Sequence, residues 1–142
     1  MINTKLTRKA MIIAYEAHKN QVDKSGVPYI YHPIHVAEQM DTENECIIAL
    51  LHDVVEDTNV TFKQLEEVFS KEIIDILKLL TKKKEIDYYE YINKIKENAV
   101  ARKAKIADIK HNLDRSRLDV ITDKDIKREE KYKKALSILM SK

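Results

Sequence analysis

The amino-acid sequence predicts an all-α protein, because apolar residues recur at helical spacing, strand-like alternation is absent and helix breakers are confined to one short segment. The chain of 142 residues has one glycine and two prolines, and all three lie between positions 26 and 33. Elsewhere it lacks the residues that most often end a helix. A length of 142 residues is typical of one domain with one core, so we expect residues 1–142 to form a single helical bundle.

The first third of the chain predicts a helix, a loop and a second, shorter helix. A helix is expected over residues 4–19, with an inward stripe of Leu6, Ala10, Ile13, Ala14 and Ala17. Residues 20–33 hold every breaker and are expected to form a loop, in which residues 29–31 are extended before Pro33. A short helix is expected from Ile34 to about Met40.

The middle of the chain carries two helix-start signals. Thr42 followed by Glu45 is a capping-box pattern and predicts a helix that runs to about Asp57. The same pattern at Thr61 predicts a helix over residues 62–69.

The second half of the chain continues the helical pattern to its end. Four more helices are expected, over residues 71–80, from about Asp87 to Glu97, over about 99–115, and over 123–140. Tyr88 and Tyr91 are expected to lie on the packed face of their helix.

The composition excludes several classes of protein. The net charge is +2 with both signs interleaved, which is too weak to indicate a nucleic-acid partner. The single Cys46 excludes an internal disulfide framework and a cysteine-rich zinc site, and it suits a reducing compartment. No stretch resembles a signal peptide or an apolar membrane span. We therefore expect a cytoplasmic protein without a membrane partner; the sequence does not predict its oligomeric state.

The segment 49–58 combines ionisable side chains with apolar neighbours. His52 and Glu56 stand four residues apart. Asp53 and Asp57 repeat that spacing, so all four side chains are expected on one helix face. Such a face is costly to bury unless partners neutralise it. A divalent cation would do so, because imidazole and carboxylate together bind manganese, iron or zinc.

Two further clusters could complete such a site. Asp108, His111 and Asn112 follow helical spacing, and the loop supplies His32. The sequence therefore predicts a metal site with open positions for water or substrate, formed by His32, His52, Asp53 and Asp108. The alternative is that each histidine is a satisfied core residue and that the acidic pair at the helix end bridges to lysines.

The order and spacing of these motifs resembles the HD superfamily, and within it the hydrolase domain of RelA/SpoT-type proteins and the small stand-alone alarmone hydrolases. The resemblance extends from about residue 10 to residue 118. It rests on Ala17-His18, the loop from Lys24 to Pro33, the segment from Ala49 to Thr58, and Lys105-Ile106-Ala107-Asp108 with His111-Asn112.

This resemblance implies a reaction and a set of roles. In that family the reaction is hydrolytic removal of the 3′-pyrophosphate from guanosine tetra- or pentaphosphate. It implies that manganese is bound by His32, His52, Asp53 and Asp108. It implies that Glu56 and Asp57 position or activate the attacking water and handle protons. It also implies that Lys24 faces the substrate phosphates and that Asn112 lies near the nucleotide sugar.

Two departures from the family pattern bear on the substrate. The family often has an arginine before the loop lysine, where its guanidinium can pack on guanine, but this chain has Asp23. After the His-Asn pair the alarmone hydrolases commonly carry a small hydroxyl residue that faces the nucleotide, whereas here the segment reads Leu113-Asp114-Arg115-Ser116-Arg117. The alternatives are therefore an HD phosphohydrolase for another nucleotide or a phosphorylated cofactor, and a non-catalytic nucleotide or metal sensor.

Overall fold

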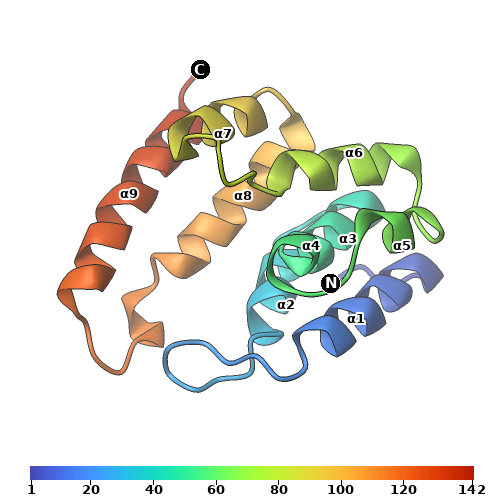
Figure 1. The fold of residues 1–142 in the computed structure, drawn as a ribbon, viewed down its shortest axis with the longest axis horizontal. Coiled ribbons are helices and arrows are strands. Elements are labelled where there is room, and N and C mark those ends of the chain that lie inside the picture. The colour runs from blue at the N-terminus through green and yellow to red at the C-terminus, as the bar shows by residue number, and fades with distance from the viewer.

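Helices account for all of the regular secondary structure in the computed structural model, which describes residues 1–142 (Figure 1). The all-α prediction is therefore confirmed. In chain order the elements are α1 (Lys5–His18), α2 (Tyr31–Glu38), α3 (Glu43–Leu51), α4 (Val54–Asp57), α5 (Phe62–Glu66), α6 (Lys71–Leu80), α7 (Tyr88–Lys96), α8 (Ala99–Asn112), the 3-10 helix η1 (Arg115–Arg117) and α9 (Asp123–Met140).

Helix starts follow the capping residues of the sequence. The side chain of Thr42 accepts a hydrogen bond from the backbone N–H of Glu45, 3.2 Å away, and begins α3. Thr61 and Thr122 form complete capping boxes at the starts of α5 and α9. The predicted helices over 71–80 and 123–140 have the bounds that the sequence indicates, because each cap satisfies backbone donors that would otherwise lack partners.

The second helix begins earlier than the sequence predicts. α2 starts at Tyr31, and Ile30 is already helical with φ −54° and ψ −28°, so the prediction of an extended segment that ends at Pro33 is wrong. Pro33 lies in the first turn of α2, where a backbone N–H has no helical partner in any case. His32 therefore projects from the first turn of a helix. The preceding loop turns at Gly26, whose φ of +81° suits glycine.

The helix predicted to run from Thr42 to about Asp57 is interrupted. α3 ends at Leu51, and α4 begins at Val54. The carbonyl oxygen of Ala49, which an unbroken helix would offer to the backbone N–H of Asp53, lies 2.6 Å from Nδ1 of His52. The side chain of His52 thus competes with the backbone at the point where the helix breaks. Two other predicted helices are shorter than expected: α5 ends at Glu66, and α8 at Asn112.

The core is a cluster of 27 buried apolar residues centred on α3. Every residue from Cys46 to Leu51 is buried, so α3 has no solvent-facing side in its second half. Helices α1, α2, α6 and α8 pack around it, and α9 lies along α7 and α8 on the far side (Figure 1). No helix is both long and apolar enough to cross a membrane.

The hydroxyl of Tyr91 joins α7 to α6. It donates to the carbonyl oxygen of Leu80 at 2.7 Å inside the protein. We expect Tyr91→Phe to lower the free energy of unfolding by about 1–3 kcal/mol, because the buried carbonyl loses its partner. Tyr89→Phe is the matched control, since that hydroxyl makes no hydrogen bond. If urea denaturation showed that both variants lose the same free energy of unfolding, this expectation would be wrong.

Candidate metal centre

Four side chains from three parts of the fold converge at one point. His32 comes from the first turn of α2, His52 and Asp53 from the break between α3 and α4, and Asp108 from α8. One ligand atom from each residue lies within 4.8 Å of the ligand atoms of the other three. Three of the four residues are buried, and Asp53 is half-buried. The structure thus brings together the residues that the sequence predicted to meet.

The imidazole of His52 is aimed into this cluster. Its Nδ1 donates to the carbonyl oxygen of Ala49, which leaves Nε2 for the cluster. Nε2 lies 3.0 Å from Oδ2 of Asp53 and 3.5 Å from Oδ1 of Asp108, yet it is buried and makes a hydrogen bond with neither. A metal-binding histidine typically donates its other ring nitrogen to a carbonyl in this way.

The second imidazole is held between two partners. Nε2 of His32 lies 2.8 Å from Oδ1 of Asp108, and Nδ1 lies 2.7 Å from Nδ1 of His111. The rings of His32 and His111 are nearly parallel, and His35 stacks on His111 with ring centroids 3.8 Å apart. Burial, together with the charge of Arg117, lowers the pKa of His111 to about 4, so His111 is neutral near neutral pH.

Both carboxylates of the cluster are ionised. Burial favours the neutral acid at Asp108, but the ammonium of Lys105, 3.0 Å from Oδ2, outweighs it and holds the pKa well below its usual range. At Asp53, burial is likewise outweighed by the charge of His52, and the pKa falls to about 2. Asp53 also accepts a hydrogen bond from the hydroxyl of Tyr29.

The same charges act on His52. Burial opposes its protonation, but Asp53 and Asp108 outweigh burial and hold its pKa well above the ordinary value. Without a metal ion, the two carboxylates therefore favour a positive charge on His52. A divalent cation fits the same place, because it would neutralise two carboxylates and satisfy the unpartnered Nε2. Two imidazoles with two carboxylates suit manganese, iron or zinc.

The acidic pair of α4 lies beside the cluster and not in it. Oε1 of Glu56 accepts a hydrogen bond from the backbone N–H of Lys82 at 2.8 Å. Asp57 is in contact with solvent; partial burial of its carboxyl, followed by the negative charges of Asp53 and Glu56, raises its pKa to about 6. No lysine side chain forms an ion pair with either residue, so the alternative of helix-end salt bridges is wrong.

The two predicted substrate contacts have different surroundings. Nδ2 of Asn112 donates to Oδ1 of Asp108 at 3.1 Å, so this amide lies at the edge of the cluster. The ammonium of Lys24 forms an ion pair with Asp125 at the start of α9, and its side chain is 40% exposed. Lys24 therefore lies outside the cluster and links the first loop to the last helix.

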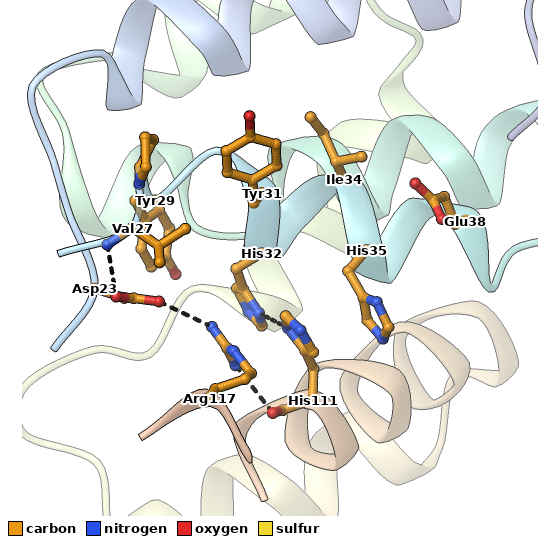
Figure 2. Close-up of a pocket in the computed structure, with 11 residues that line it drawn as sticks. Asp23, Val27, Tyr29, Tyr31, His32, Ile34, His35, Glu38, His111 and Arg117 are labelled. Carbon is orange, nitrogen blue, oxygen red and sulfur yellow. Dashed lines mark hydrogen bonds and ion pairs between the residues drawn. The ribbon is translucent and has the colours of Figure 1, made fainter. Parts of the chain in front are cut away.

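A cavity of about 360 Å³ opens next to His32 (Figure 2). It is lined by Asp23, Val27, Pro28, Tyr29, Tyr31, His32, Ile34, His35, Glu38, His111 and Arg117. Several of these residues, His35 and Arg117 among them, are not site residues that the sequence predicts. His35 is one turn along α2 from His32, a spacing that is visible only when residues 31–38 are recognised as a helix. Arg117 reaches the cavity from η1, which no sequence pattern indicates.

Comparison with known proteins shows where the chain has relatives. It is 39% identical over 82 residues to the bifunctional (p)ppGpp synthase/hydrolase SpoT of Escherichia coli K12, an alignment that covers 55% of this chain and 12% of SpoT. It is 34% identical over 127 residues to the GTP pyrophosphokinase rsh of Brucella melitensis, covering 79% of this chain and 17% of that protein. The chain thus spans less than a fifth of the length of these relatives.

The fold also has a solved counterpart. A structure described as a metazoan ortholog of SpoT that hydrolyzes ppGpp superposes with a TM-score of 0.80 at 24% identity, and the match covers 99% of this chain and 89% of that one. This likeness confirms the helical architecture. The model of the HD domain family matches residues 10–118, which include all four residues of the cluster. The chain therefore belongs to the HD domain family.

Proposed function

We propose that this protein is a metal-dependent phosphohydrolase that removes the 3′-pyrophosphate from a guanosine alarmone such as (p)ppGpp. The observation that carries the proposal is the buried cluster of two imidazoles and two ionised carboxylates beside an open cavity. The names of SpoT and of the metazoan ortholog support the choice of substrate. We further propose that residues 1–142 form one HD-type domain that acts in the cytoplasm.

The proposed cofactor is a divalent cation, with Mn²⁺ as the first candidate. It would be held by His32, His52, Asp53 and Asp108. When bound, such a cation polarises a phosphoryl oxygen and lowers the pKa of water. Two features favour binding of the cation: Nε2 of His52 points into the cluster, and both carboxylates are ionised.

The acidic pair of α4 is assigned to the attacking water. Asp57, with a pKa of about 6, is mostly ionised near neutral pH. Its carboxylate can accept a proton from the attacking water while the water oxygen forms a bond to phosphorus. The bond from phosphorus to the ribose 3′ oxygen then breaks, and that oxygen takes up a proton. Glu56 is assigned to position the water, because the backbone N–H of Lys82 holds its carboxylate in place.

Two further residues are proposed to contact the substrate. The ammonium of Lys24 retains two hydrogens after its bond to Asp125, and we propose that they bind a phosphate group of the substrate. Asn112, whose amide donates to Asp108, is proposed to lie near the sugar. Both roles extend the family resemblance to this chain.

The proposal predicts the product of the reaction. Purified protein supplied with Mn²⁺ should release pyrophosphate from guanosine tetraphosphate and leave GDP, and Asp53→Asn should abolish this because the cation loses a ligand. Asp41→Asn, an exposed carboxylate paired with Lys103, is the matched control and should retain activity. Release of orthophosphate from another nucleotide would indicate a different phosphohydrolase. Binding without any turnover would indicate a sensor.

The role of Asp57 predicts a pH profile. Because the ionised carboxylate is the active form, kcat/KM should fall about tenfold per pH unit below the pKa of Asp57. That pKa is about 6 without a metal ion, and a bound cation would lower it. Asp57→Asn should reduce kcat by about 10²–10⁴-fold and leave Mn²⁺ affinity in place. Asp75→Asn, on the exposed face of α6, serves as control. Full activity of Asp57→Asn at pH 7 would rule out this role.

A further inference from the structure

The cavity beside the metal centre contains an acid–base pair contributed by two distant segments. Oδ2 of Asp23, in the first loop, lies 3.8 Å from Nη2 of Arg117, in η1, and both side chains are about four-fifths shielded from solvent (Figure 2). We infer that this pair reads the base of the bound nucleotide and makes the site selective for guanine over adenine. The inference rests on the proposed function, which puts a nucleotide in this site.

The carboxylate of Asp23 is fixed in place by its own loop. Oδ1 accepts hydrogen bonds from the backbone N–H groups of Ser25 and Val27, at 2.9 and 3.0 Å. That oxygen has therefore used both of its lone pairs. Oδ2 has no hydrogen bond, since the contact with Arg117 is longer than one. One carboxylate oxygen thus remains as an unused acceptor at the wall of the cavity.

The guanidinium of Arg117 is fixed from the opposite side. Nη1 donates to the carbonyl oxygen of His111 at 2.9 Å and to Oδ1 of Asn112 at 3.3 Å, at the end of α8. Nε and Nη2 make no hydrogen bond and remain free to donate. Because both partners are oriented before a ligand arrives, little side-chain freedom is lost on binding.

The hydrogen-bond pattern of guanine matches this pair and that of adenine does not. Guanine presents two neighbouring donors, N1–H and N2–H₂, followed by the acceptors O6 and N7. The donors suit the free oxygen of Asp23, and the acceptors suit the free N–H groups of Arg117. Adenine presents a single donor between two acceptors, so its N1 lone pair would face the carboxylate. A site built for hydrogen bonds rejects a ligand that leaves them unmade.

The test is the affinity for GDP and for ADP, measured by titration calorimetry in the presence of Mn²⁺. The native protein should bind GDP roughly tenfold to a hundredfold more tightly than ADP. Asp23→Asn keeps an oxygen for the loop hydrogen bonds but replaces the free acceptor with a donor, so the preference should vanish or reverse. Arg117→Met should also lose the preference for GDP over ADP. Glu38→Gln, the other carboxylate at the cavity, is the control and should keep it.

Each outcome separates the inference from the proposed function. Equal affinities for GDP and ADP in the native protein, or an unchanged preference in both Asp23→Asn and Arg117→Met, would overturn the inference. Pyrophosphate release from guanosine tetraphosphate, measured on the same samples, tests the proposed function. Release without a base preference would refute only the inference. A GDP preference that both variants lose, without any release, would support the inference and refute the proposed reaction.

Discussion

Two ionised carboxylates and two imidazoles share one buried point, and the rest of the site depends on how that charge is balanced. Asp53 and Asp108 keep low pKa values mainly because positive charge lies close to them, on His52 and on Lys105. In the absence of a cation, a proton on His52 supplies part of that charge. Since metal ligands must be deprotonated, a divalent cation and this proton compete for the same place. The composition of the cluster thus explains both why it can be buried and why it should bind metal.

The fold provides this cluster by interrupting its own helices. The break between α3 and α4 lets His52 and Asp53 project together from the most buried helix of the protein. The early start of α2 at Tyr31 anchors His32 to a rigid first turn. A site on helices and on their ends is held more precisely than one on a long loop. The cavity then opens along α2, and His32 is the residue that the cavity and the cluster share.

The sequence predicted those parts of the structure that depend on local interactions. Helices α6 and α9 have the predicted bounds because their caps and apolar stripes lie within each segment. The meeting of His32, His52, Asp53 and Asp108 was predicted from spacing, apolar context and family resemblance, and the geometry agrees. Their roles in binding metal and in catalysis, like those of the acidic pair, remain proposals.

The errors arose where a non-local or side-chain interaction overrides a local pattern. Pro33 predicts the end of an extended segment, but in the first turn of α2 a proline is compatible with a helix. The bond between His52 and the carbonyl of Ala49 ends a helix that the apolar pattern continues. The fold also brings Arg117, from a distant segment, beside Asp23. Spacing in one chain cannot show such a contact.

The most direct test of the account is the position of the metal. Crystals grown with Mn²⁺ can be measured on both sides of the manganese absorption edge to locate the ion by anomalous scattering. We expect a strong anomalous peak enclosed by His32, His52, Asp53 and Asp108. The absence of a peak at this point, or manganese bound only elsewhere on the protein, would contradict it.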